Sequence, residues 1–244
     1  MSKGIVISLY DYTGEALKPW AMNGYECYAF DIQHTSNPME WFYGEDGVYG
    51  NIRYRYADLH DRKTLLDLEM DFKLKALQGE RIIFGMAFPV CTDLAVSGAA
   101  WFKRKEEENP GFQDKAVRHA VRCARLFNEL GIPYFIENPV SVLATKWRKP
   151  DYSFHPYEYG EYIPDDEAEH PRWPDYIAPK DAYTKKTCLW TSYSFRMPHR
   201  LPTCKPNGYS AQHLKLGGKS KRTKDIRSAT PRGFATAVYE FNRA

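Results

Sequence analysis

Residues 4–14, with the sequence GIVISLYDYTG, contain the pattern that decides the fold. The first seven of them form a short apolar run that is typical of a buried strand. A helical pattern follows at residues 15–22, and a second apolar run at residues 25–30 predicts another strand. A strand, a helix and a strand in this order predict the first unit of a parallel sheet.

The same alternation continues through the first half of the chain. Two further strands, two helices and the start of a fifth strand are predicted, in chain order, at residues 52–57, 63–77, 81–87, 114–130 and 133–136. Each of the two helices is followed by a glycine, which is a common helix stop. The residues between the second and third strands, 33–51, are expected to form a loop. We therefore expect an α/β fold with a Rossmann-like, doubly wound and mostly parallel sheet.

The second half of the chain has a different character. It is rich in Pro, aromatic residues, His and charge, and it contains few periodic segments. We interpret residues 1–144 as the main domain and residues 145–226 as a small irregular subdomain. The run KLGGKSKRTK at residues 215–224 is expected to be a basic loop. Residues 227–244 are expected to form a C-terminal helix that returns to the main domain.

The composition indicates a soluble, cytoplasmic protein. The chain has 244 residues, of which 43% are hydrophobic, so it can bury a sizeable core. Its apolar runs are too short to span a bilayer, and its first residues do not resemble a secretory signal. Five cysteines with no CxxC pair indicate reduced thiols. Residues 1–144 carry 16 Lys and Arg against 20 Asp and Glu, whereas residues 145–244 carry 18 against 11, so the second half is the expected surface for an anionic partner.

Polar residues follow the ends of the predicted strands. In an open parallel sheet, ligands bind beyond the carboxyl ends of the strands. The five strand ends carry, in chain order, a turn glycine, two carboxylates, a thiol and a third carboxylate: Gly14, Asp31, Asp58, Cys91 and Glu137. We expect these residues to lie along one edge of the sheet and to form a site.

Each of these residues also has a simpler interpretation. Gly14 suits an ordinary turn, and Asp31 and Asp58 suit helix caps. Cys91 suits packing, because most free cysteines behave as small buried apolar residues. Glu137 is harder to explain in this way, because it follows an apolar run where burial of a carboxylate is costly. The ordered set therefore indicates function more strongly than any single member.

At these residues the chain resembles the DNA cytosine-5 methyltransferase family, particularly its compact, phage-type members. Residues 8–14 (SLYDYTG) are similar to the family's cofactor motif, and residues 90–98 (VCTDLAVSG) to its nucleophile motif. Residues 137–139 (ENP) are similar to its E-N-V motif. The basic motif that follows resembles residues 184–187 (TKKT), and the last motif resembles residues 227–241.

The resemblance implies a domain of the class I methyltransferase type, which methylates C5 of cytosine in DNA with S-adenosylmethionine as the methyl donor. Cys91 would add to C6 of the base as a thiolate, and Glu137 would contact N3 and the exocyclic amine. The cofactor would be bound by residues near the strand ends: Tyr10, Thr13, Gly14, Asp31, Ile32, Asp58, Leu59 and Pro89. The DNA would be bound by four residues: Ser97, Asn138, Lys185 and Lys186. A phage-encoded enzyme of this kind would act in the host cytoplasm.

Some residues differ from the family's pattern and leave other functions open. Tyr12 stands where the family has a glycine, Val90 where it has a proline, and Thr92 where it has a glutamine. The alternatives are the same chemistry on RNA or on a free cytosine nucleotide, and a non-catalytic nucleic-acid-binding relative that keeps the fold. We expect no metal, because the spacing of the His and Cys residues fits no recognised zinc pattern. No membrane and no obligate protein partner are expected.

Overall fold

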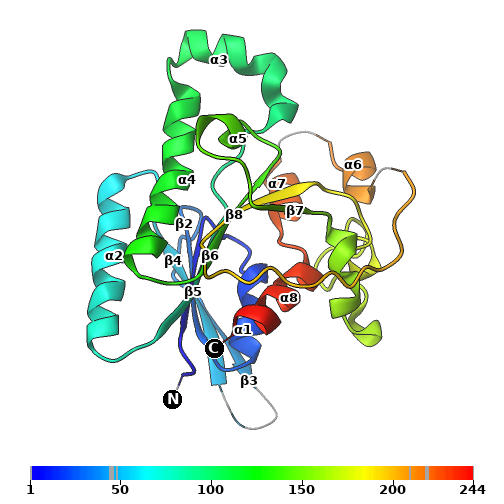
Figure 1. Cartoon of the computed structure of the whole chain (residues 1–244). Helices are drawn as coiled ribbons and strands as arrows, with labels where there is room; N and C mark the ends of the chain where they lie inside the picture. Colours follow the sequence, from blue (N-terminus) through cyan, green and yellow to red (C-terminus); the bar gives the residue numbers. More distant parts are fainter. Residues whose placement is uncertain (1, 44–46, 48, 209, 218–219, 244) are drawn as a thin grey trace. The chain divides into compact units, whose positions relative to one another are not determined.

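The computed structural model describes residues 2–43, 47, 49–208, 210–217 and 220–243, with only the backbone of residue 49. Contacts divide the chain into two compact units. Figure 1 shows the whole chain, coloured by residue number. Unit 1 comprises residues 1–12, 20–153 and 187–195, and unit 2 comprises residues 13–19, 154–186 and 196–244. This division differs from the predicted boundaries, because residues 187–195 belong to unit 1 and the C-terminal residues belong to unit 2.

Unit 1 is built on a single sheet of eight strands, in the order β3-β4-β2-β1-β5-β6-β8-β7. The strands are β1 (Ile5–Leu9), β2 (Glu26–Asp31), β3 (Met39–Tyr43), β4 (Tyr49–Tyr56), β5 (Ile82–Ala87), β6 (Tyr134–Pro139), β7 (Tyr152–Phe154) and β8 (Thr187–Thr191). The five strands from β4 to β6 pair in parallel, whereas β3 pairs antiparallel with β4 and β8 pairs antiparallel with β6. The chain starts at β1, builds outward through β2 and β4, and then crosses to β5 and β6 on the other side. The predicted α/β fold with a mostly parallel sheet is thus confirmed, and it is compatible with a Rossmann-like fold.

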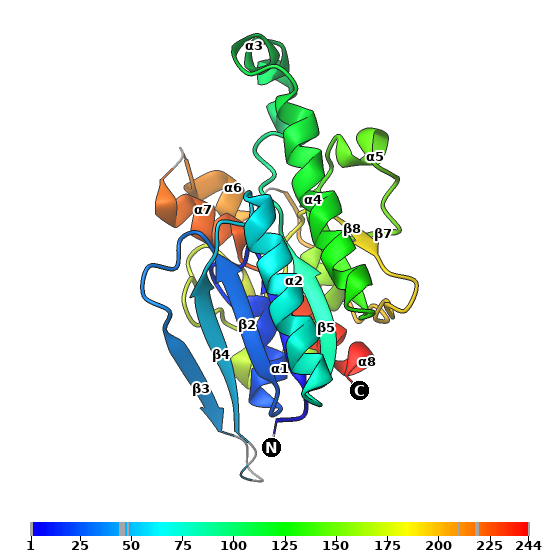
Figure 2. The same ribbon diagram turned by 90° about the vertical axis from the view of Figure 1, so that its left-hand side faces the viewer.

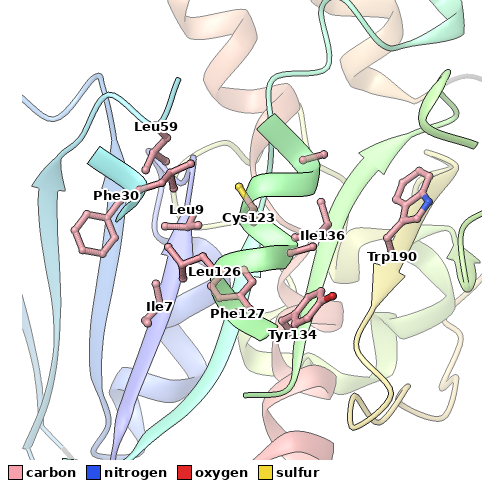
Figure 3. Close-up of a cluster of buried hydrophobic side chains, with 14 of the residues drawn as sticks. Ile7, Leu9, Phe30, Leu59, Cys123, Leu126, Phe127, Tyr134, Ile136 and Trp190 are labelled. Carbon is pink, nitrogen blue, oxygen red and sulfur yellow. The ribbon is translucent and has the colours of Figure 1, made fainter. Parts of the chain in front are cut away.

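Two long helices cover one face of this sheet, as Figure 2 shows. They are α2 (Arg62–Leu77) and α4 (Phe112–Glu129). Alternate residues of β1, among them Ile7 and Leu9, point toward these helices and pack with Leu126 and Phe127 of α4 in the main core (Figure 3). On the opposite face of the sheet, Trp20 stacks on Phe84 with ring centroids 5.2 Å apart.

Gly85 of β5 allows α4 to approach the sheet closely. A Cβ atom at this position would lie 2.4 Å from Cδ1 of Phe127. We expect Gly85→Ala to lower the free energy of unfolding by about 1–3 kcal/mol, because the ring would have to move within a packed core. Urea denaturation would measure the loss. Gly98→Ala is the matched control, since the nearest atom to its added Cβ is 3.8 Å away; equal stability of both variants would contradict the expectation.

The remaining elements are short. Unit 1 also contains η2 (Val96–Trp101), α3 (Phe102–Glu108) and α5 (Leu143–Lys146). Unit 2 contains η1 (Glu15–Leu17), η3 (Pro156–Tyr162), η4 (Asp165–Glu167), η5 (Pro179–Asp181), α6 (Ala211–Lys215), α7 (Lys221–Ser228) and α8 (Arg232–Asn242), while α1 (Lys18–Met22) spans the division. In unit 2 the ring of Phe234 stacks on Phe154 at 4.0 Å and meets Tyr159 edge-on. No helix in the described ranges is both long and apolar enough to cross a bilayer.

Two expectations about local structure were wrong. Residues 33–51 contain β3 and the first residues of β4 instead of a continuous loop. The side chains of β3 are almost all exposed, so this edge strand has no pattern of burial by which to recognise it. The basic run at 215–224 is not a loop throughout, because it includes the end of α6 and the start of α7. Residues 218 and 219 of that run lie outside the described residues.

Candidate functional site

The site is centred on the carboxyl ends of β5 and β6, which are neighbouring parallel strands. Their pairing brings Ala87 beside Ile136 at the last aligned position. The residues that follow are therefore held side by side, with the loop to Cys91 leaving β5 and Glu137 continuing β6. The side-chain amide of Asn138 donates a hydrogen bond to the carbonyl oxygen of Pro89 across 2.9 Å. This bond connects the two segments that the sequence predicts to carry the thiol and the carboxylate.

Cys91 lies in a tight loop whose position is fixed by backbone hydrogen bonds. Its carbonyl oxygen accepts hydrogen bonds from the amides of Leu94 and Ala95, at 3.0 and 2.8 Å. Beyond this turn, the Val96 amide donates to the Val140 carbonyl oxygen at 3.0 Å. The Leu94 side chain is fully buried and anchors the loop, while Cys91 itself is exposed. Cys91 is therefore on the surface, where a ligand can reach it. Its loop is connected to the segment after β6 by the hydrogen bond between Val96 and Val140.

Glu137 is held in the sheet by its pairing with one neighbouring strand. Its backbone lies on β6, where it pairs with Leu189 of the antiparallel strand β8. The residue is half-buried, and its Oε1 atom is buried. Asn138, predicted to bind DNA, has a side chain that is only 1% exposed. Its observed role is to join β6 to Pro89, which positions Glu137 relative to the Cys91 loop.

Two carboxylates lie at the neighbouring strand ends of unit 1. Asp31 ends β2 and is buried; its Oδ1 accepts a hydrogen bond from the Gln33 amide at 2.8 Å. Asp58 follows β4, and its Oδ1 accepts one from the His60 amide at 3.0 Å. Among the described residues, no donor contacts the Oδ2 atom of either carboxylate. Beside them the apolar side chain of Ile32 is 55% exposed.

Tyr10 ties the end of β1 to the segment after β4. Its backbone is left-handed, with φ of 58°, which turns the chain sharply after the strand. The phenol donates a hydrogen bond to the Leu59 carbonyl oxygen at 2.9 Å, and Leu59 itself is buried. Burial raises the pKa of Tyr10 well above its usual range, so the group remains a neutral donor. Tyr10 therefore fixes the position of Leu59, the residue after Asp58.

The other predicted site residues are placed as follows. Gly14, in unit 2, adopts a left-handed φ of 69° and precedes η1, and Thr13 Oγ1 accepts a hydrogen bond from the Glu15 amide at 3.4 Å. Ser97 is exposed on η2 of unit 1. In unit 2, Lys185 donates to the Arg227 carbonyl oxygen at 2.9 Å, and Lys186 is exposed.

Sequence reasoning missed a histidine pair next to Asp58. The rings of His60 and His119 stack with their centroids 4.2 Å apart, and the His60 ring lies 5.8 Å from that of Tyr10. Burial, reinforced by His60 and Arg122, lowers the pKa of His119 to about 4, so this ring is neutral near pH 7. The only signal in the sequence was the position of His60 two residues after a strand-end carboxylate. Its partner comes from the middle of α4, which no local pattern connects to it.

Comparisons with known proteins do not identify this site. No protein-family model matches the chain, and no curated protein matches it. Within the ranges described, no three His, Cys, Asp or Glu side chains are grouped as metal ligands would be. Function must therefore be inferred from the residues at the strand ends and from their arrangement.

Proposed function

We propose that this protein transfers a methyl group from S-adenosylmethionine to C5 of cytosine in DNA. The observation that carries the proposal is the hydrogen bond from Asn138 to the carbonyl oxygen of Pro89. It holds the exposed Cys91 and the half-buried Glu137 on the adjoining ends of two parallel strands. A thiol and a carboxylate at one sheet edge suit covalent activation of a pyrimidine, in which one group adds to carbon and the other exchanges a proton.

The strand-end residues of unit 1 fit the cofactor in their chemistry. The Oδ2 atoms of Asp31 and Asp58 have no donor among the described residues, so they suit the ribose hydroxyls and the adenine amine. The exposed side chain of Ile32 suits one face of the adenine ring, whose burial would be favourable. The partly exposed Tyr10 supplies further surface at this edge, whereas Leu59 and Pro89 are buried and are proposed to support the backbone there. Gly14 and Thr13 lie in unit 2, so their part in cofactor binding rests on the resemblance of residues 8–14 to the cofactor motif alone.

The chemistry follows from the electronic structure of cytosine. S-adenosylmethionine supplies an electrophilic methyl group. Bond formation between Cys91 Sγ and C6 moves the C5–C6 π electrons onto C5, which becomes nucleophilic. Glu137 provides a proton at N3 and so stabilises the electron-rich ring. After methylation a general base removes the C5 proton, the electrons of the C6–Sγ bond leave with Cys91 as the thiolate, and the C5–C6 double bond is restored. The N3 proton returns to Glu137.

Charge supports a nucleic acid as the substrate. Residues 196–244, all in unit 2, carry 11 Lys and Arg against two Asp and Glu. A basic segment of this kind suits a phosphate backbone. A cytosine inside a duplex would have to leave the base stack to reach Cys91. Lys185 and Lys186 are assigned to DNA contact because of their positive charge, and the exposed Ser97 is assigned by its place in the motif at residues 90–98.

The decisive experiment incubates the protein with tritiated S-adenosylmethionine and one of four acceptors: duplex DNA, single-stranded DNA, RNA or dCMP. We expect label in duplex DNA, and enzymatic digestion of the product should place it in 5-methylcytosine. Label only in RNA or only in dCMP would keep the chemistry and change the substrate. No label in any acceptor, together with no cofactor binding, would leave a non-catalytic relative as the better interpretation.

Asp31→Ala is expected to weaken cofactor binding by about 10- to 100-fold, because one charge-assisted hydrogen bond to the ribose would be lost. Calorimetry with S-adenosylmethionine would measure the change. Asp31→Asn keeps an oxygen that can accept from the Gln33 amide, and so separates a local structural effect from the loss of charge. The matched control is Asp67→Ala, on the exposed side of α2, where the carboxylate contacts only Lys63 among the described residues. Unchanged affinity in both Asp31 variants would contradict the placement of the ribose.

A further inference from the structure

Helices α2 and α4 enclose a groove on the outside of unit 1. The two helices lie side by side in Figure 2, and the groove between them has a volume of about 190 Å³. Three arginines line it, Arg62 from α2 and Arg122 and Arg125 from α4. Leucines from both helices provide an apolar floor. The groove does not include any of the strand-end residues assigned above to catalysis or to the cofactor.

The arginines of this groove differ from the other cations nearby. Lysines of α2 are paired with carboxylates: Lys63 with Asp67, Lys73 with Glu69 and Lys75 with Glu80. In contrast, within the part of the chain that the structure describes, no carboxylate forms an ion pair with Arg62, Arg122 or Arg125. Glu69, the single acid lining the groove, is bound by Lys73 at 2.6 Å. The groove is therefore a concentration of uncompensated positive charge, which an anion would stabilise.

The row of arginines continues along α4. Arg118 precedes Arg122 by four residues and Arg125 by seven, so all three lie on one helical face. Seven residues of α-helix span about 10 Å. One strand of DNA carries a phosphate about every 3.4 Å along its axis, so such a row can meet two or three consecutive phosphates. Guanidinium groups bind phosphate oxygens through paired N–H donors, which lysines cannot reproduce.

The groove begins next to the edge of the sheet that carries the proposed active site. Arg122 donates a hydrogen bond to the His60 carbonyl oxygen at 3.4 Å. The His60 amide in turn donates to Asp58 at the end of β4. Through Arg122 and His60 the groove therefore adjoins the strand-end region of unit 1 at Asp58.

We infer that the α2–α4 groove binds the phosphate backbone of DNA, outside the segment that contains the target cytosine. The inference rests on the proposed function for the identity of the substrate. Arg62, Arg122 and Arg125 would each contact a phosphate, and the leucine floor would lie against the sugar. Contacts of this kind carry no sequence information, and they strengthen and orient binding.

The test is the salt dependence of duplex binding by the whole protein without cofactor. A labelled 30-base-pair duplex is titrated between 50 and 200 mM salt, and fluorescence anisotropy is measured. We compare the wild type with the triple variant Arg62→Gln, Arg122→Gln, Arg125→Gln. In the variant, the plot of the logarithm of the association constant against the logarithm of the salt concentration should be shallower, its slope smaller in magnitude by about 2 to 3. The affinity at 50 mM salt should fall at least about tenfold. Arg125→Gln alone should reduce the magnitude of the slope by about 1. This single variant keeps the inference testable if the triple variant does not fold.

A control variant removes the same charge elsewhere on unit 1. It combines Lys3→Gln and Arg81→Gln, which precede β1 and β5 at the opposite ends of the strands, with Lys75→Gln near the end of α2. An equal loss of slope in this control, or an unchanged slope in the triple variant, would overturn the inference. A loss of dCTP binding in the triple variant with duplex binding intact would also overturn it, in favour of a small-anion site. The salt titration does not depend on methyl transfer, which the tritium assay measures separately. A protein that shows the expected salt effect here but methylates no cytosine in that assay would refute the proposed function and leave this inference standing.

Discussion

Cys91→Ser is expected to reduce methyl transfer by at least roughly 10⁴-fold, because a hydroxyl cannot replace a thiolate as the group that adds to C6. The side chain is exposed, and its loop is held by backbone hydrogen bonds that the substitution leaves in place. The fold and the affinity for S-adenosylmethionine should therefore stay close to those of the wild type. Single-turnover transfer of tritium to duplex DNA gives the rate, and calorimetry gives the cofactor affinity.

The chain offers a matched control for this substitution. Within the described residues the cysteines Cys91 and Cys204 are exposed, whereas the other three are buried. Cys204→Ser should retain full activity, since Cys204 lies in unit 2 and has no assigned role. Duplex DNA with 5-fluorocytosine supplies a second readout, because fluorine cannot leave C5 as a proton does and the adduct should persist. A covalent complex that still forms with Cys91→Ser and is lost with Cys204→Ser would show that Cys204, and not Cys91, is the nucleophile.

Most of the sheet could be predicted from the sequence because its central strands are buried. The segments that became β1, β2 and β5 are short apolar runs, and the structure buries nearly every residue in them. The exposed edge strand β3 lacks that pattern and was predicted as loop. Strand β8 was also missed, although its side chains are mostly buried. It lies among aromatic and polar residues, and its partner β6 is about 50 residues earlier in the chain.

The sequence predicts which strand ends carry the candidate site, but it does not predict the contacts between the side chains there. A parallel sheet brings the residues after Asp31, Asp58 and Ala87 to one edge, and this follows from topology alone. The bond between Asn138 and Pro89 depends on the register of two strands, which the sequence does not specify. For the same reason Asn138 was expected at the DNA, although its side chain is buried. The contact between His60 and His119 likewise depends on the packing of α4 against the sheet.

Glu137→Gln is expected to reduce methyl transfer by about 10²- to 10⁴-fold, the usual contribution of a positioned acid or base. The amide has nearly the same size as the carboxyl group and can donate a hydrogen bond, but it cannot deliver a proton to N3. The backbone of Glu137 pairs with Leu189 irrespective of the side chain, so β6 should keep its place in the sheet. We therefore expect unchanged thermal stability and cofactor affinity together with a large loss of rate.

Glu137→Gln and Asn138→Ala separate chemistry from positioning at this edge. Asn138→Ala removes the bond to Pro89 and leaves both reacting side chains in the chain, so its rate should fall because the Cys91 loop is less well held. Its free energy of unfolding should also fall, by about 1–3 kcal/mol, since a buried carbonyl oxygen loses its donor. The Glu137 variant should show the rate loss without the loss of stability. Were Glu137→Gln to transfer methyl groups within tenfold of the wild-type rate, proton donation by this residue would have to be abandoned, and the carboxylate would be left with a structural role on β6.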